Sequence, residues 1–302
     1  MDDIKKRIRV TKLWDKVFLV AGLLSTLVGL VLLFALMADL FMNGYPRLSY
    51  KFFTSFPSRF PDQAGILSAW VGSFLVLLVT AFAAIPLGVA AGIYLEEYAR
   101  KNWITDIIEI NIANLAGVPS IVYGLLALGL FVYFFKFGES ILTGGLALAL
   151  LILPMVIMAT REAIRAIPNS IREASYALGA TKWQTVQHHI IPYSTGGILT
   201  GVIIGLSRAI GETAPIITVG ALTFIAFLPT SPFMSSFPFI NFKWLMDPFT
   251  VMPIQMFNWV SRPQQAFQLN AAAAGLVLMA MTLLMNGVAI YIRYRFRKRI
   301  KW

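Results

Sequence analysis

Six long, almost uncharged apolar stretches constrain what this chain of 302 residues can fold into. A helix needs about 20 mostly apolar residues to cross about 30 Å of hydrocarbon, and every stretch reaches that length. We therefore predict an all-α integral membrane protein with six transmembrane helices. The stretches run approximately over Val17–Phe41, Ile66–Leu95, Ile104–Phe135, Ile141–Thr160, Thr195–Leu222 and Leu269–Ile292.

The composition agrees with a protein surrounded by lipid. Charged residues make up 13% of the chain, about half of their share in soluble domains. A soluble enzyme, a disordered chain and a nucleic-acid-binding module are therefore disfavoured. The chain has no cysteine, which excludes disulfides and thiolate metal sites. We also find no other metal-binding pattern and no nucleophile constellation, so we expect no catalytic residues.

Basic residues predict the orientation of the spans. Eighteen of the 25 basic residues lie before the first stretch, after the second and fourth, and in the tail, and six lie on the opposite side. By the positive-inside rule, both termini are then cytoplasmic. Most of these basic residues are expected to contact lipid headgroups. The predicted segments are a basic N-terminus (1–16), a six-span domain (17–292) with a cytoplasmic loop (161–193) and an outer loop (223–268), and a basic tail (293–302).

Two of these segments have special features. The third stretch has polar residues in its first half and is predicted to break at Pro119, because proline removes a backbone hydrogen bond inside a helix. The outer loop carries Trp244 and Trp259. We expect it to lie along the outer membrane interface, where aromatic rings are favoured.

The cytoplasmic loop carries two helix-start signals. Ser170 with Glu173, and Thr181 with Gln184, have the spacing of a capping box. Gly179 between them suits the left-handed residue that ends a helix, and Pro192 is expected to stop the second helix. The first helix would present Glu173, Ala174, Tyr176, Ala177 and Leu178, and the second Trp183, Val186 and Ile190. These residues predict either a docking surface or a helix pair lying on the inner leaflet.

One basic residue, Arg208, lies within an apolar stretch. If the fifth span covers 195–222, Arg208 falls at its midpoint, where a charge costs about 2.5–3.5 kcal/mol. Glu212 lies one helical turn away on the same face. Gly197, Gly201 and Gly205 would let another helix approach closely. The pair is therefore either an internal ion pair that holds the bundle together or a buried guanidinium that binds an oxyanion, with Glu212 as its counter-ion or gate.

The cytoplasmic loop resembles the EAA loop of bacterial ABC importer permeases. The resemblance rests on Arg172-Glu173-Ala174-Ser175, on Gly179 six residues after Glu173, and on Pro192 thirteen residues further. Ser175, His189 and Ile191 depart mildly from the usual pattern. In that family the loop docks onto the ATP-hydrolysing subunit. The resemblance thus implies docking residues at Glu173, Ala174, Tyr176, Ala177, Leu178, Gly179, Ala180 and Thr181.

A second resemblance covers nearly the whole chain. The segments 114–124, 160–164 and 205–215 are similar to those of the phosphate-specific (Pst) permeases, and more to the PstA type of subunit than to the PstC type. This implies the MetI-like permease fold and a phosphate path at Arg208 and Glu212, with Ser207 and Thr213 beside them. Arg161 would either meet the exiting anion or anchor in headgroups.

The same resemblance implies partners. These are a homologous PstC-like permease subunit, a PstB-like ATPase homodimer on the inside and a PstS-like phosphate-binding protein outside. The chain has no phosphate-binding loop of its own, so we expect ATP and magnesium to be bound by the ATPase. A permease for sulfate, molybdate or phosphonate is an alternative. A self-sufficient anion transporter is a further one, against which the EAA-like loop argues.

Overall fold

The structure, a computed structural model, describes residues 2–233 and 241–297, and the regular secondary structure of this part of the chain is helical. Five helices are long: α1 (Asp2–Gly44), α3 (Leu67–Ile93), α6 (Ile141–Arg165), α9 (Ile191–Gly211) and α12 (Gln265–Arg297). The shorter ones are α2 (Tyr50–Thr54), α4 (Trp103–Leu115), α5 (Ser120–Ala127), α7 (Asn169–Ala177), α8 (Lys182–Thr185), α10 (Ala214–Thr218) and α11 (Met252–Val260). Three π-helical segments cover Tyr94–Tyr98, Leu128–Phe134 and Val186–Ile190, and short 3₁₀ turns cover Tyr45–Arg47, Pro61–Gln63 and Lys243–Met246.

The long helices account for the predicted spans. Within the described residues, five helices are long and apolar enough to cross a membrane, and a sixth span results if α4 and the helix that starts with α5 count together. Those two are bent by 106° at a break of four residues that includes Pro119. The predicted all-α membrane fold is confirmed, as is the predicted break.

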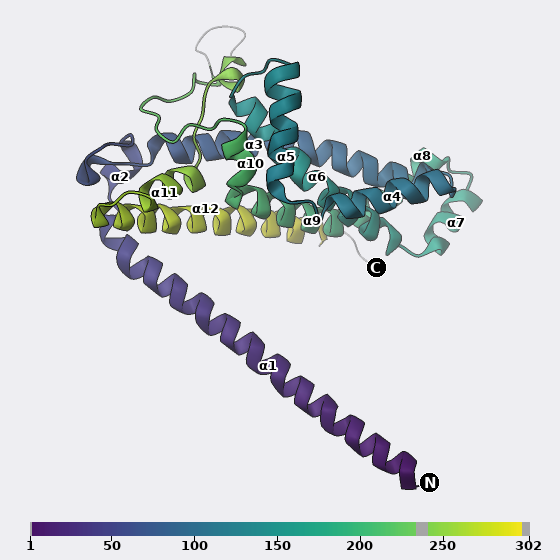
Figure 1. Ribbon diagram of the computed structural model, residues 1–302. Helices are drawn as coiled ribbons and strands as arrows, with labels where there is room; N and C mark the ends of the chain where they lie inside the picture. Colours follow the sequence, from purple (N-terminus) through teal and green to yellow (C-terminus); the bar gives the residue numbers. More distant parts are fainter. Residues whose placement is uncertain (1, 234–240, 298–302) are drawn as a thin grey trace.

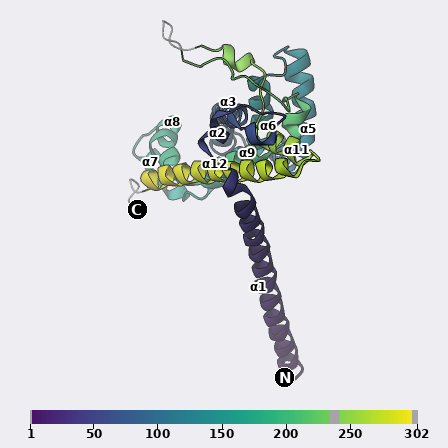
Figure 2. The same ribbon diagram turned by 90° about the vertical axis from the view of Figure 1, so that its left-hand side faces the viewer.

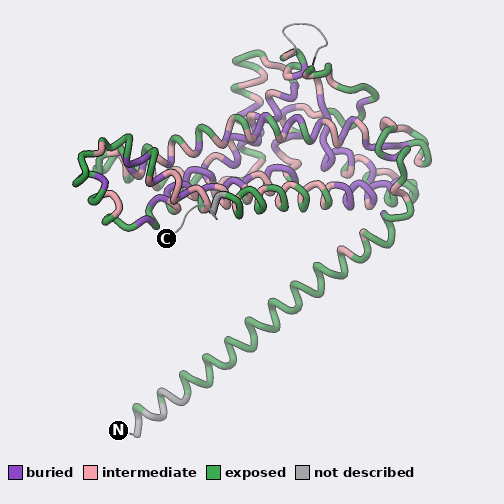
Figure 3. The backbone as a smooth tube through the Cα atoms, turned by 180° about the vertical axis from the view of Figure 1, so that it is seen from behind, coloured by how far each residue is buried: buried purple, intermediate pink, exposed green. Residues whose placement is uncertain are grey.

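Helices α3, α6, α9 and α12 lie side by side and form the bundle (Figures 1 and 2). Helix α6 is its centre, with buried faces toward both α3 and α9. Small residues make this packing possible, because a Cβ atom added to Gly88 or Gly92 of α3 would collide with Val156 or Thr160 of α6. Close backbone approach of this kind is typical of helices that pack in membranes. Figure 3 shows the buried positions concentrated in this bundle.

Helix α1 stands apart from the bundle. It has 43 residues, and none of the residues in its most apolar window is buried. It touches the rest of the chain near Gly44, where an added Cβ would collide with the backbone of Ala272 and Ala273 in α12. From there it runs away from the bundle (Figures 1 and 3). The predicted basic N-terminus, as far as it is described, continues α1 without a break, and of the predicted tail, residues 298–302 lie outside the described residues.

The segment 223–268 differs from the prediction. Trp244 and Trp259 are buried in the protein and do not lie in an exposed aromatic belt. Trp259 belongs to α11, which packs against α3 and α12, and Trp244 joins the core around α6. These two rings are core residues, and composition alone does not separate that use of an aromatic residue from an interfacial one. The position of the segment along the outer interface stays a prediction. Part of this segment, residues 234–240, lies outside the described residues.

Candidate functional site

Helix α9 is held against α6 by a stripe of glycines. A Cβ atom added to Gly197 or Gly201 would collide with Ala163 or Ala159 of α6, and one added to Gly205 would touch Ile152. The predicted close approach of another helix is therefore confirmed. It fixes α9 on one side, so that the side chains at its end have a defined position relative to α6.

Arg208 lies in the last turn of α9, and Glu212 lies just beyond the end of the helix. The Nε atom of Arg208 donates a hydrogen bond to Oε1 of Glu212 at 3.2 Å, and the Nη1 atom of Arg208 lies 3.6 Å from the sulfur of Met155 in α6. The two side chains are 34% and 19% exposed. A cation in the last turn of a helix is also favoured by the partial negative charge of the helix end. The predicted ion pair is therefore present.

The helical geometry predicted for this pair was wrong. We expected one helix over 195–222 with Arg208 at its midpoint, but α9 ends at Gly211 and Glu212 has extended backbone angles. A short helix, α10, follows from Ala214. Pro215 explains the break, because it has no N–H to bond to Gly211 and its ring would clash with that carbonyl.

The break beside Arg208 meets the break between α4 and α5. Helix α10 packs against α5, where Gly124 leaves no room for a side chain beside Pro215 and Thr218. The buried Tyr123 of α5 donates a hydrogen bond from its hydroxyl to the carbonyl of Leu115 at 2.7 Å and so bridges that break. Irregular backbone at this depth is tolerated where it is packed in protein or lines a cavity.

Ser207 and Thr213, the neighbours of the pair, have different surroundings. The Ser207 hydroxyl lies 2.6 Å from Oδ1 of Asn286 in α12 and 2.7 Å from the carbonyl of Ile203. It therefore takes part in the contact between α9 and α12. The carbonyl of Thr213 accepts hydrogen bonds from the amides of Ile216 and Ile217 and so starts α10.

Arg161 lies further along α6, six residues after Met155, which is about 9 Å of helix. It is buried, and its Nη2 atom lies 2.6 Å from Oε1 of Glu109 in α4. Its Nε atom lies 3.5 Å from Oε2 of Glu96. Arg161 is thus an internally paired cation. In the described structure it is not brought into contact with Arg208.

The excursion over residues 161–193, whose cytoplasmic position stays a prediction, forms two short helices after α6, as predicted. Gly179 has a φ of +84°, which is the left-handed conformation, and Thr181 and Gln184 form the expected capping box. The first capping box was wrong, because α7 starts at Asn169 with Pro168 at the N-cap, two residues earlier than a helix capped by Ser170 would start. The prediction for Pro192 was also wrong, because the chain runs helically from α8 through the π turn into α9. That wider turn just before Pro192 lets the helix continue past the proline.

The exposed face of this excursion is smaller than predicted. Glu173, Ala174, Tyr176, Ala177 and Leu178 are all exposed, and Leu178 most of all, at 89%. Gly179 and Thr181 are exposed as well, Ala180 is partly exposed, and Trp183 of the second helix is exposed. Val186 and Ile190 are instead fully buried in a cluster with Ile164 and Ile167. They fasten the excursion to the bundle and are not available for docking.

The comparison with known families decides the class of this chain. A family model described as "Binding-protein-dependent transport system inner membrane component" matches residues 84–302. The chain belongs to this family. The part from Ala84 onward includes the two broken helices, the Arg208 pair and the excursion over residues 161–193, so all the sites described above lie within the family region. The chain is accordingly a multi-pass membrane protein.

Individual relatives agree with this family. The chain is 35% identical to the probable ABC transporter permease protein YqgI of Bacillus subtilis, over 74% of this chain and 76% of that one. It is 31% identical to the phosphate transport system permease protein PstA of Yersinia pestis, over 94% and 91% of the two chains. Among solved structures, an inward-facing MetNI methionine ABC transporter matches with a TM-score of 0.56 at 14% identity, over 74% of this chain and 94% of that one. The last likeness concerns the fold, which is the predicted permease fold.

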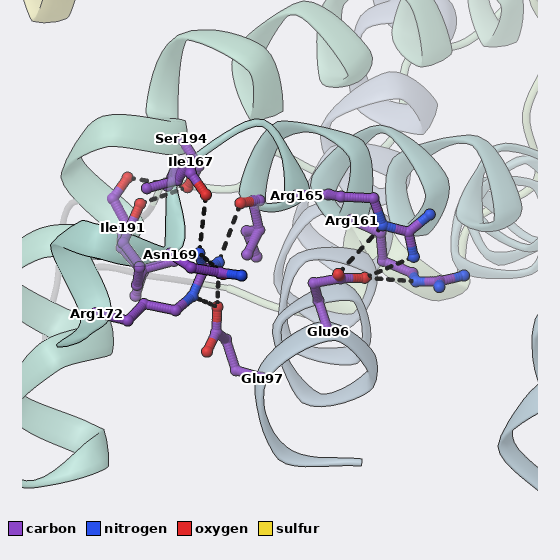
Figure 4. Close-up of polar contacts among 11 residues, drawn as sticks. Glu96, Glu97, Arg161, Arg165, Ile167, Asn169, Arg172, Ile191 and Ser194 are labelled. Carbon is purple, nitrogen blue, oxygen red and sulfur yellow. Dashed lines mark hydrogen bonds and ion pairs between the residues drawn. The ribbon is translucent and has the colours of Figure 1, made fainter. Parts of the chain in front are cut away.

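Several residues of this permease were not found by sequence reasoning. Glu96 and Glu97 lie in the π turn after α3 and point in different directions (Figure 4). Glu96 pairs with Arg165, whose Nη2 atom lies 3.0 Å from Oε2. Glu97 pairs with Arg172 of α7. The only signal in the sequence was an acidic pair at the end of an apolar stretch, which does not reveal partners about 70 residues away.

Proposed function

We propose that this chain is the transmembrane permease subunit of an ATP-driven importer for inorganic phosphate. The observation that carries the proposal is the likeness over nearly the full chain to a phosphate transport permease, together with a partly buried guanidinium at the end of α9. Further PstA permeases of Haemophilus influenzae and Pasteurella multocida are each 32% identical over 79% of this chain. A fixed guanidinium fork is well suited to a tetrahedral oxyanion.

The geometry of Arg208 supports anion binding beside its counter-ion. Glu212 accepts its hydrogen bond from Nε, and within the described residues no carboxylate accepts one from Nη1 or Nη2. The outer edge of the guanidinium therefore remains available while Glu212 stays in place. The thioether of Met155 at Nη1 is a weak acceptor that an anion would displace easily. In this proposal Arg208 binds phosphate, and Glu212 holds the guanidinium between transport cycles. In the same proposal, Ser207 fixes the backbone before the pair through its contact with α12, and Thr213 fixes the backbone after the pair by starting α10.

Arg161 has a different part in this proposal. Its two carboxylate partners neutralise it, so it would anchor α4 to α6 near the cytoplasmic end of the path. An anion leaving Arg208 would meet it only if Glu109 moved away.

The energy for transport would come from a separate subunit. The relatives are ABC permease subunits, and we propose that ATP and magnesium are bound by an ATPase homodimer that docks on α7. The exposed residues Glu173, Ala174, Tyr176, Ala177 and Leu178, with the turn Gly179, Ala180 and Thr181, would form the docking surface. A homologous permease subunit would complete the path, and an extracytoplasmic phosphate-binding protein would deliver the cargo.

The test is uptake of labelled phosphate by the whole transporter in proteoliposomes. We expect uptake to need ATP inside and to be nearly abolished by Arg208→Gln, while the Arg208→Gln subunit still assembles with the ATPase. Unlabelled sulfate, molybdate and phosphonate should compete poorly. If one of them competes better than phosphate, the alternative importer for that oxyanion is correct. Uptake by the purified chain alone, without an ATPase, would establish a self-sufficient transporter instead.

A further inference from the structure

Three consecutive residues in the π turn after α3 contact three different elements. Glu96 pairs with Arg165 of α6. Glu97 pairs with Arg172 of α7, and the ring of Tyr98 lies 5.1 Å from the Nζ atom of Lys182 in α8. The end of α3 is therefore a junction between the bundle and the cytoplasmic helices (Figure 4).

The pair between Glu97 and Arg172 is the most buried of these contacts. Its side chains are 6% and 15% exposed, whereas Arg165 is 53% exposed. Both Nε and Nη2 of Arg172 donate to Oε1 of Glu97, at 3.0 and 2.7 Å. Exposed ion pairs contribute little to stability, but breaking a buried, hydrogen-bonded one is costly. The contact between α3 and α7 is thus much stiffer than a surface contact.

Arg172 also holds the end of α6. Its Nη1 atom donates to the carbonyl of Ile167 at 2.9 Å, and its Nη2 atom lies 3.2 Å from the carbonyl of Ile164. These carbonyls lie at and just beyond the C-terminal turn of α6, so one guanidinium links α7 to both α6 and α3. The chain itself connects α7 to α6 through residues 166–168. No short connecting segment joins α7 to α3. The ion pair between Glu97 and Arg172 therefore links these two helices where the chain does not.

Helix α3 leads from this junction to the Arg208 region. Ser73, Val76 and Leu77 lie about 30–36 Å along the helix from Glu97. They line a small gap that Ile210 and Glu212 line from the other side. Helix α3 is continuous between these points despite Pro86, and its glycines hold it against α6. A displacement of one end of α3 therefore reaches the surroundings of Glu212.

We propose that Glu97 is a positioning residue through which α3 follows the movements of α7 and α8, so that ATP-driven movement of the docked helices reaches the Arg208 site. The inference rests on the ATP-driven part of the proposed function and not on the identity of the cargo. It assigns different tasks to two adjacent carboxylates. Glu96 holds α3 on the bundle, and Glu97 holds it on the moving helices.

The experiment uses the whole transporter with a reporter beside Glu212. Gly211 is exposed and an added Cβ would meet nothing within 4 Å. The chain has no other cysteine, so in this subunit Gly211→Cys is labelled specifically by a water-soluble maleimide. We expect ATP to change the labelling rate in the parent, and Glu97→Gln and Arg172→Gln each to reduce that change about tenfold. The combined exchange Glu97→Arg with Arg172→Glu should restore part of it, because the exchange forms the ion pair again but not the bonds from Arg172 to the carbonyls of Ile164 and Ile167.

The control and the contrary results are defined in the same preparation. Glu162→Gln removes an exposed carboxylate that pairs with Arg165 and should leave the ATP-dependent change intact. Co-purification of the ATPase and its hydrolysis rate should be retained in Glu97→Gln. An unchanged labelling response in Glu97→Gln, loss of the ATPase from that variant, or a parent that does not respond to ATP would each overturn the inference. If the parent responds to ATP but carries another anion, the proposed phosphate cargo fails and this inference stands.

Discussion

Arg208 and Glu212 are joined by a hydrogen bond of 3.2 Å from Nε to Oε1, although the helix that carries Arg208 ends between them, at Gly211. An i, i+4 pair inside a helix is held by the backbone of that helix. Here Glu212 itself has extended backbone angles and lies between α9 and α10. Its carboxylate therefore moves when the junction between these two helices moves. The pair can therefore open without unwinding a helix.

Replacing Glu212 by Gln should tighten phosphate binding. In the proposed function the anion binds beside Glu212, where the negative charge of the carboxylate repels it, and the amide does not carry that charge. We expect the KM for phosphate uptake to fall about tenfold, which corresponds to about 1.4 kcal/mol less repulsion, with a lower kcat because release becomes slower. Initial uptake rates across a phosphate series measure both. An unchanged KM, together with loss of thermal stability, would show that the pair only holds the bundle together.

Replacing Arg161 should affect stability more than affinity. Arg161→Met leaves the partly exposed Glu109 without this partner, while Glu96 keeps Arg165, so we expect a cost below the about 3–5 kcal/mol of breaking a fully buried pair. We expect a clear fall in the melting temperature of the purified subunit with little change in the KM of the complex that still assembles. Adding Glu109→Gln should recover part of the stability. A selective rise in KM at normal stability would instead place Arg161 on the anion path.

The glycine stripe of α9 should tolerate no side chain at its centre. At Gly201 an added Cβ collides with Ala159 of α6, and we expect Gly201→Val to destabilise the bundle by about 1–3 kcal/mol. Gly196 on the same helix is the matched control, because nothing lies within 4 Å of an added Cβ there. Thermal unfolding in detergent compares Gly201→Val with Gly196→Val. Equal melting temperatures would refute the packing argument.

The docking surface should be separable from the fold. Leu178 is 89% exposed, so Leu178→Asp should leave the melting temperature within about 2 °C, since surface substitutions usually change stability by no more than about 0.5 kcal/mol. We expect the same variant to lose co-purification with the ATPase. Leu228→Asp, at an exposed leucine of the segment after α10, is the control and should retain the ATPase. Retention by both variants would mean that α7 is not the docking helix.

Local chemistry made part of the site predictable from the sequence. Gly179 and the capping box of Thr181 depend on residues within a few positions, and both were found. Pro119 gave the break between α4 and α5 for the same reason. Pro215 is an equally local signal for the end of α9. Because the residues on both sides of it are apolar, hydropathy predicts one continuous span across this proline. Hydropathy measures length in lipid and does not report where a helix stops.

Other features depend on contacts that no local pattern contains. Glu97 and Arg172 are 75 positions apart, and their pairing follows from the packing of α3, α6 and α7. Trp259 and Val186 were expected at surfaces because of their residue type and helical position, and the fold buries both. Position in a membrane bundle is set by neighbours, since lipid and protein interior are equally apolar.

The π turn after α3 makes this permease sensitive to the length of a helix as well as to its residues. Most insertions in a transmembrane helix are absorbed by tilt, because one apolar residue more or less changes little in lipid. In α3 a single added or deleted residue would rotate the helix end by about 100°. Glu96 would then no longer face Arg165, and Glu97 would no longer face Arg172. The contact between α3 and α7 thus depends on the number of residues in α3. Adding or deleting one residue would separate Glu97 from Arg172 of α7 without altering a single charge.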